Sequence, residues 1–311
     1  MDVDNFLGLP PSQSDPRRAR YAVLPVPYDA TTSFQTGARW GPRAVITASQ
    51  QVELFDAEYG REFVAPGIAT LDPVEPIADP AAMHEAVYQA ARRPVEQGRF
   101  LIGLGGEHSI TSGLVRAVLR RHPKLSVLQI DAHADLRAEY HGTPFSHAAV
   151  MRRVLEFGAR HVAVGIRSFS REEHRFMKAQ GMEPWSPARI RREPDWVEAV
   201  VAGLGEEVYI TIDIDGFDPA AAPATGTPEP GGLDWWQVND LLRAVARRRT
   251  VVAADVMEVS PQPGGMQTEF LAARLIYKLI AHVEAARGGR GHGRGPPPHG
   301  RSAYRSAAPP G

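Results

Sequence analysis

The sequence predicts an α/β fold, with a parallel sheet covered by helices on both faces, in one domain from residue 21 to 287. Short apolar runs alternate with helix-like stretches along this region, which is the order that strand–helix–strand units produce. Each run is mostly apolar on both of its alternating sides, as in a strand that is buried on both faces. The expected strands are residues 22–26, 100–104, 125–130, 162–166, 208–212 and 251–256.

Three of the intervening helices have clear local signals. Two capping boxes mark helix starts, because each pairs an N-cap side chain with an acid or amide three residues later. Apolar residues that recur every four positions over 271–283 predict a final helix, which we expect Gly288 to end. The two capping boxes are Ser170 with Glu173 and Asp234 with Gln237.

The two ends of the chain differ in composition from this region. Residues 1–20 contain several prolines and are expected to form an irregular extension. Residues 288–311 are rich in glycine, proline and arginine and contain no acid, so we expect a disordered tail that cannot bury a core.

Composition and charge exclude several classes of function. The chain has 311 residues, no cysteine and a formal net charge of −1. Disulfides, thiolate nucleophiles and Cys-ligated metals are therefore absent, and no strong field for nucleic acid exists. No secretory leader and no apolar run of the roughly 18 residues that a membrane helix needs is visible. We expect a cytoplasmic protein without nucleic-acid or membrane partners.

Acids and histidines follow four of the expected strands. Ligands in a parallel α/β sheet bind beyond the carboxyl ends of its strands. In extended backbone, residues two apart project to the same side, so each group can converge on one site. The groups are His108; then Asp131, His133 and Asp135; then Asp213 and Asp215; and finally Glu258. The alternative is that each acid caps a helix or lies in a loop.

Four carboxylates at one sheet edge would repel one another without cations, and two divalent ions would balance them. Two imidazoles and four carboxylates form a mainly oxygen-donor set, which suits manganese better than copper but leaves nickel, cobalt, zinc and iron open. Two such ions can activate a shared water for hydrolysis. Glu258 is surplus to this set and can hold a planar cation. The alternative role for Glu258 is a cap or an ordinary salt bridge.

A further histidine, His147, follows the DAHAD motif and can pass a proton to a leaving amine. The alternative is a solvated loop histidine, and the nearby His141 competes for the role.

Five stretches in order resemble the ureohydrolases, the family of arginase and agmatinase, and most closely the agmatinases. They span about residues 21–282 and read VPYDATTSFQTGARWGPRAV, GLGGEHSIT, DAHADLR…SHAAVMRR, DIDGFDPAAAPATGTPEPGGL and DVMEVSP. The resemblance implies a three-layer α/β/α fold around a mostly parallel eight-stranded sheet. It also implies a homo-oligomer, trimeric or hexameric, and two Mn²⁺ ions per subunit.

The resemblance also assigns roles to the candidate residues. One ion would be bound by His108, Asp131, Asp135 and Asp213, and the other by Asp131, His133, Asp213 and Asp215. Asp131 and Asp213 would then bridge, and Asp135 belongs to the catalytic set as well. A metal-bridging hydroxide would attack the guanidinium carbon, while Glu258 orients the guanidinium and His147 transfers a proton. The products would be urea and an amine.

The expected substrate is a small cationic guanidino compound, agmatine, which would give putrescine. Arginases hold the substrate α-carboxylate with an Asn/Ser/Thr-rich loop, and residues 136–145, LRAEYHGTPF, lack that pattern. Arg137 leaves open a guanidino acid such as guanidinobutanoate, or arginine.

Three other classes fit less well. A metal-dependent deacetylase would use one zinc ion without His108 and Asp135. A non-catalytic relative would have lost a ligand, and none is missing. An RNA-binding protein would need a basic body with an aromatic platform.

Overall fold

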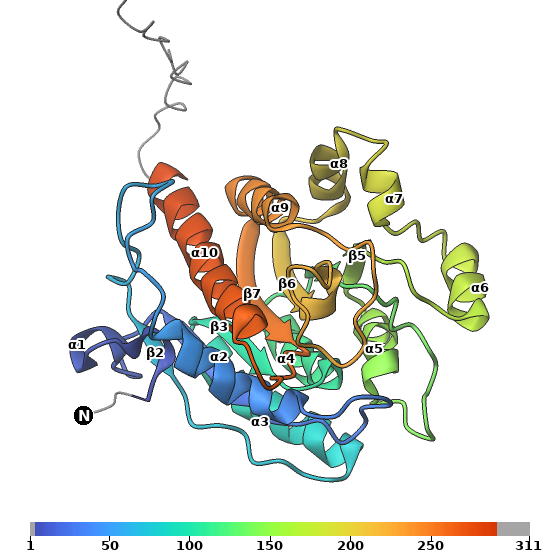
Figure 1. Cartoon of the computed structure of the whole chain (residues 1–311), viewed down its shortest axis with the longest axis horizontal. Coiled ribbons are helices and arrows are strands. Elements are labelled where there is room, and N and C mark those ends of the chain that lie inside the picture. The colour runs from blue at the N-terminus through green and yellow to red at the C-terminus, as the bar shows by residue number, and fades with distance from the viewer. Residues whose placement is uncertain (1–3, 291–311) are drawn as a thin grey trace, which may run out of the picture.

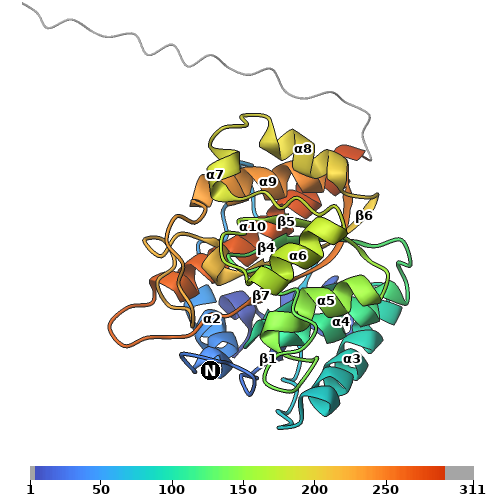
Figure 2. The same cartoon turned by 90° about the vertical axis from the view of Figure 1, so that its right-hand side faces the viewer.

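The computed structural model describes residues 4–290 and confirms the α/β class. One parallel sheet lies between two helical layers (Figures 1 and 2). Its strand order is β2-β1-β3-β7-β6-β4-β5. The strands are β1 (Tyr21–Val26), β2 (Ile68–Thr70), β3 (Phe100–Gly105), β4 (Ser126–Ile130), β5 (Arg160–Val164), β6 (Glu207–Asp213) and β7 (Thr250–Met257).

The sheet has seven strands within residues 4–290, so the expectation of eight is wrong. All six runs that the sequence predicted form strands, with ends that differ by up to two residues. The strand that the sequence did not reveal is β2, which has three residues at the sheet edge and pairs only with β1. A run this short contains too few alternations to produce a periodic signal.

Helices connect the strands and confirm both predicted capping boxes. In each box the N-cap side chain accepts a hydrogen bond from the backbone N–H of residue N3. The side chain of residue N3 in turn accepts one from the backbone N–H of the N-cap residue. The longer helices are α2 (Gly41–Ser49), α3 (Pro80–Glu96), α4 (Thr111–Leu119), α5 (Val150–Glu156), α6 (Arg171–Ala179), α8 (Trp196–Gly203), α9 (Trp235–Arg248) and α10 (Gln267–Arg290). Two single-turn helices complete the set, α1 (Pro11–Ser14) and α7 (Pro187–Ile190).

The expected end of the last helix at Gly288 is wrong, because α10 continues to Arg290. A helical glycine costs only about 1 kcal/mol relative to alanine. It therefore ends a helix only where the backbone turns left-handed, and the glycines with positive φ do not include Gly288. The rest of the expected tail, residues 291–311, lies outside the described residues.

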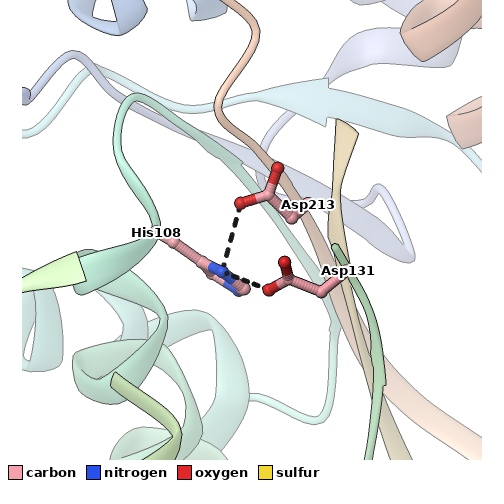
Figure 3. A group of neighbouring side chains, drawn as sticks. All are labelled: His108, Asp131 and Asp213. Atoms are coloured by element: carbon pink, nitrogen blue, oxygen red, sulfur yellow. Dashed lines mark ion pairs between the residues drawn. The ribbon is translucent and has the colours of Figure 1, made fainter. Parts of the chain in front are cut away.

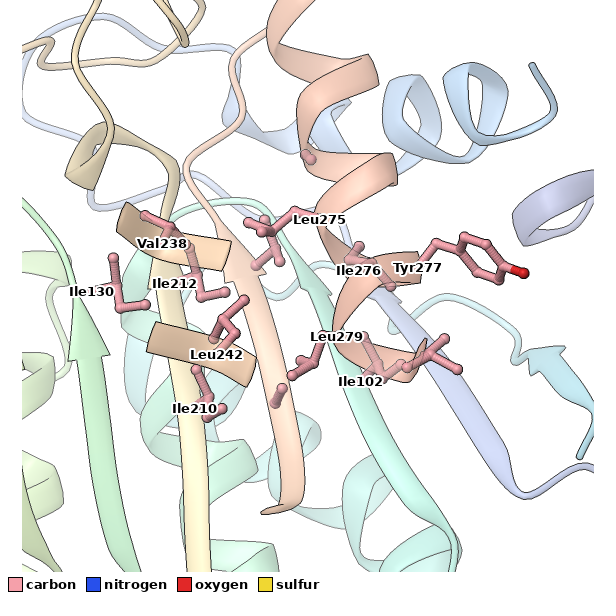
Figure 4. Close-up of a cluster of buried hydrophobic side chains, with 14 of the residues drawn as sticks. Ile102, Ile130, Ile210, Ile212, Val238, Leu242, Leu275, Ile276, Tyr277 and Leu279 are labelled. Carbon is pink, nitrogen blue, oxygen red and sulfur yellow. The ribbon is translucent and has the colours of Figure 1, made fainter. Parts of the chain in front are cut away.

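Alternate residues of each strand face two separate cores. Ile102 and Ile210 pack with helices α2, α8, α9 and α10, whereas Leu101 and Tyr209 pack with α3, α4 and α5 on the opposite face. Figure 4 shows the first core, where the strand residues meet side chains of α9 and α10. This pattern confirms that the central strands are buried on both faces, whereas the edge strand β5 is buried only in its last two residues.

The segment before β1 packs against the domain. It contains a 3₁₀ turn (Phe6–Gly8) and α1, and Phe6 and Leu9 are buried in the same core as α2. Part of this segment is therefore helical and packed against the core, whereas we expected an irregular extension. Over residues 4–290, no helix combines the length and the apolar character that crossing a membrane would require.

Candidate active site

The candidate residues lie where four neighbouring strands end. The strands β3, β7, β6 and β4 are adjacent in the sheet and all parallel. Their carboxyl ends therefore meet at one edge, as the sequence predicted. His108 follows β3, Asp131 follows β4, Asp213 ends β6, and Glu258 follows β7.

The first cluster surrounds the imidazole of His108. Its Nδ1 atom lies 3.1 Å from Asp131 Oδ2, 3.2 Å from Asp135 Oδ2 and 3.3 Å from Asp213 Oδ2. Figure 3 shows Asp131 and Asp213 directed at the ring from different strands. All four side chains are buried.

The second cluster joins Asp131, His133 and Asp215. His133 Nδ1 lies 2.9 Å from Asp215 Oδ2 and 3.8 Å from Asp131 Oδ1. Asp131 belongs to both clusters, with one carboxylate oxygen toward each. Asp213 groups with the first cluster, and its Oδ1 accepts a hydrogen bond from the backbone N–H of Asp215 at 2.9 Å.

The donor set fits metal ions. His108 Nδ1 is buried and makes no hydrogen bond, although three carboxylate oxygens lie near it. Bonds of about 2.1 Å to a common ion place neighbouring ligand atoms about 3 Å apart, which matches these spacings. The atoms therefore have the arrangement of ligands that face a shared cation.

Electrostatics point the same way. Burial disfavours a charged His108, but the three carboxylates outweigh burial and raise its pKa well above the ordinary value. Burial and the charges of Asp215 and Asp131 raise the pKa of Asp213 well above its usual range. The raised pKa values show that positive charge, as protons or as cationic imidazoles, stabilises this buried cluster of carboxylates. Divalent ions can supply the same positive charge.

His108 is oriented from behind by Thr211. Its Nε2 atom lies 2.8 Å from Thr211 Oγ1, and both residues are buried. The neutral tautomer that donates this hydrogen bond keeps the Nδ1 lone pair free for an ion. Sequence reasoning missed Thr211 because its position inside a strand carries no motif signal.

Glu258 lies beside the clusters without joining them. Its Oε1 accepts a hydrogen bond from the His108 backbone N–H at 2.7 Å, and its side chain lines the pocket. Burial and the nearby Glu107 raise its pKa. Glu258 and Asp135 have φ angles of 62° and 54°. Left-handed backbone at non-glycine residues costs of order 1–3 kcal/mol and is concentrated at functional sites.

The structure distinguishes the two candidate histidines. His147 lines the pocket, with Nδ1 3.3 Å from Thr31 Oγ1 and Nε2 3.3 Å from Ser33 Oγ. Burial lowers its pKa to about 4, so the neutral ring predominates at neutral pH. His141 is exposed and stacks edge-on against Tyr140 outside the pocket lining.

A pocket of about 330 Å³ opens onto both clusters. It includes residues that sequence reasoning did not assign, which come from the loop before α2 and from the segment leading into α6. They are Thr32, Ser33, Phe34, Gln35, Ser168, Phe169, Ser170 and Glu173. The first four lie in one of the stretches that carried the family resemblance, and that was their only sequence signal.

Comparisons with known proteins agree with this geometry. The Arginase family model matches residues 19–282. The N(1)-aminopropylagmatine ureohydrolase of Thermus thermophilus is 41% identical over 84% of this chain and 89% of its own length. The agmatinase of Pyrococcus horikoshii is 38% identical over 86% of this chain and 93% of its own. The agmatine ureohydrolase structure from Thermoplasma volcanium aligns with a TM-score of 0.83 at 32% identity, covering 93% and 97%.

The contact between Thr211 and His108 leads to a test of metal binding. Thr211→Val keeps the shape of the side chain and removes the hydroxyl. We expect Mn²⁺ affinity to fall by about 10–100-fold, as for other partners that orient a metal-binding histidine. Thr211→Ser is the matched control and should stay near wild type in a calorimetric titration. Equal affinities for all three proteins would contradict this role.

Proposed function

Because this chain belongs to the arginase family and is a ureohydrolase, a hydrolase of C–N bonds, we propose that its substrate is agmatine and its products are putrescine and urea. The observation that carries this proposal is one pocket that contains two His/carboxylate clusters, the spare carboxylate of Glu258 and the imidazole of His147.

We propose that the two clusters hold two Mn²⁺ ions. His108, Asp131, Asp135 and Asp213 would hold one ion, and Asp131, His133 and Asp215 would hold the other, with Asp213 as a further bridge. When bound, such a pair supplies positive charge and activates water near neutral pH. The buried carboxylates and imidazoles fit this role through their spacing and charge.

Glu258 is proposed to bind and orient the guanidinium group. One of its oxygens is occupied by the His108 N–H, so the other remains for substrate, with no hydrogen-bond partner within residues 4–290. A carboxylate in a site shielded from water forms a strong charge-assisted pair with a planar cation. The contact to His108 fixes the carboxylate beside the metal-binding clusters.

His147 is proposed to move the proton that hydrolysis requires. Water adds to the guanidinium carbon, the bond from this carbon to the substituted nitrogen breaks, and both protons of the water end on the departing nitrogen, which leaves as an ammonium group. A neutral imidazole in the pocket can accept a proton from the water and deliver it to the amine. No other reactant is consumed.

Agmatine and carboxylate-bearing substrates differ in what they need from the outer pocket. Arg137 lines the pocket, but its Nε lies 4.0 Å from Glu173 and its guanidinium stacks over Tyr140. These contacts hold the Arg137 guanidinium within the protein, and Glu173 is itself occupied by hydrogen bonds from the N–H groups of Leu136 and Ser170. Ser33 and Ser168 also line the pocket, so the lack of an Asn/Ser/Thr-rich pattern in residues 136–145 is a weaker argument than it was in the sequence.

N(1)-aminopropylagmatine is a second candidate substrate. Two aromatic side chains of the pocket, Phe34 and Phe169, are 72% and 45% exposed. Exposed aromatic faces attract ammonium groups through cation–π interaction, which suits a longer polyamine tail. The relative from Thermus thermophilus bears this activity in its name.

Removing the shared carboxylate tests the binuclear centre. Asp131 contributes to both clusters, so Asp131→Asn should lower manganese content from about two ions per chain to well below one and abolish activity. Asp135→Asn is the matched variant, because Asp135 contacts only the first cluster, and it should keep about one ion. Elemental analysis after dialysis measures both. One ion at saturation in a fully active wild type would refute the binuclear proposal.

Replacing each histidine in turn tests the proton-transfer role. His147→Asn should lower kcat by about 10²–10⁴-fold with metal content unchanged. His141→Asn should stay near wild type, because its ring is exposed outside the pocket lining. Steady-state kinetics of urea release measure both variants. The reverse ranking would show that the wrong histidine has been chosen.

A substrate panel tests the specificity. We expect kcat/KM for agmatine to exceed that for arginine by at least about 100-fold, because the α-carboxylate would lose water without adequate partners. Urea release from agmatine, N(1)-aminopropylagmatine, arginine and 4-guanidinobutanoate is measured under one metal condition. A preference for the aminopropyl compound would support the second candidate. A preference for a guanidino acid would reject both amines, and Arg137→Met should then remove that preference.

A further inference from the structure

A buried carboxylate outside the pocket lining accepts hydrogen bonds from the segment that contacts His147. Glu107 is fully buried and lies next to the metal-site residue His108. Its Oε2 accepts from the Thr31 backbone N–H at 2.7 Å, and its Oε1 accepts from the Thr31 hydroxyl at 2.5 Å. The Ser109 hydroxyl donates to the same Oε1. The Thr31 backbone N–H can only donate to this carboxylate, and the two hydroxyls occupy its remaining acceptor positions.

Thr31 connects this carboxylate to His147. Its hydroxyl oxygen accepts a hydrogen bond from the His147 backbone N–H at 3.1 Å and lies 3.3 Å from the ring atom Nδ1. A threonine hydroxyl has one proton, and here that proton is directed to Glu107. Toward the imidazole, Thr31 can therefore act only as an acceptor.

We propose that Glu107 and Thr31 are positioning residues that hold His147 in the tautomer with the proton on Nδ1. Toward Thr31, only a protonated Nδ1 avoids placing two lone pairs face to face. The Ser146 hydroxyl also lies 3.3 Å from Nδ1, and because it can rotate it can accept from the same N–H. The inference rests on the proposed function in one respect, namely that His147 transfers a proton.

The consequence of this tautomer lies at the other ring nitrogen. Nε2 is left as a proton acceptor, and its neighbour is Ser33, which lines the pocket. The proton that leaves the water can then bind to Nε2 and pass to the amine, while Nδ1 keeps its own proton throughout. A catalytic histidine held in the wrong tautomer has the right position but cannot accept this proton.

Kinetics provide the first test. Thr31→Val removes the acceptor, and Glu107→Gln places an amide donor among the hydroxyl and N–H donors. Both should lower kcat by about 10–100-fold, as loss of an orienting partner typically does, with little change in KM or metal content. Thr31→Ser keeps the hydroxyl and should restore most of kcat. A Thr31→Val enzyme as active as wild type would overturn the proposal.

A double-mutant cycle shows whether these residues act through the imidazole. In a His147→Asn background, Thr31→Val should cause no further loss of kcat, because the ring that it orients is gone. The same fold loss in both backgrounds would mean that Thr31 merely supports the fold, and would overturn the proposal.

The tautomer itself can be observed without turnover. Histidine-selective ¹⁵N NMR of the zinc-loaded protein, which is diamagnetic, reports which ring nitrogen carries the proton. The His147 signals are assigned by their absence in His147→Asn. We expect a protonated Nδ1 in wild type and Thr31→Ser, and loss of this preference in Thr31→Val. A proton on Nε2 in wild type would overturn the inference even if His147 proves essential. A silent His147→Asn would instead overturn the proton-transfer role.

Discussion

The burial of four carboxylates around two imidazoles is the constraint on which the rest of this structure depends. Ionised groups that lose water without compensation are very unfavourable, and here Asp131, Asp135, Asp213 and Asp215 are all nearly inaccessible. Burial, together with repulsion from Asp215 and Asp131, raises the pKa of Asp213. Such a cluster is stable only when something positive balances it. The same electrostatic demand that costs stability would favour the binding of the divalent ions that we propose for this site.

The sheet provides the rigidity that this arrangement requires. Because β3, β7, β6 and β4 are adjacent and buried on both faces, the residues at their ends cannot drift apart to relieve the repulsion. Two residues of the site have strained backbone, because Asp135 and Glu258 adopt the left-handed conformation. Packed surroundings can maintain such conformations at functional sites, where they aim a side chain that relaxed backbone would direct elsewhere.

The pocket is completed by the loop between β1 and α2, which is fastened independently of the metal-site residues. The buried carboxylate of Asp29 accepts from Arg39 Nε at 2.5 Å and from the Gly37 backbone N–H at 3.0 Å, which closes the loop on itself. The start of this loop at Tyr28 packs directly against Gly106. Any larger residue at Gly106 would clash, because its Cβ would lie 1.9 Å from the Tyr28 carbonyl oxygen. This close fit places Thr31 against both Glu107 and His147.

The sequence by itself determined the fold class, six of the strands and every residue of the two clusters, because these depend on local pattern. Apolar runs indicate strands that are buried. Acids spaced by two residues after a strand indicate side chains that project to the same side of the backbone. Only the tertiary structure decided the rest. It showed the short edge strand β2, placed His147 rather than His141 in the pocket lining, and brought Thr31, Thr211 and Glu107 behind the histidines. The physical reason is that a hydrogen bond depends on position in space. Thr31 and His147 are 116 residues apart, and nothing in either local sequence indicates that they meet.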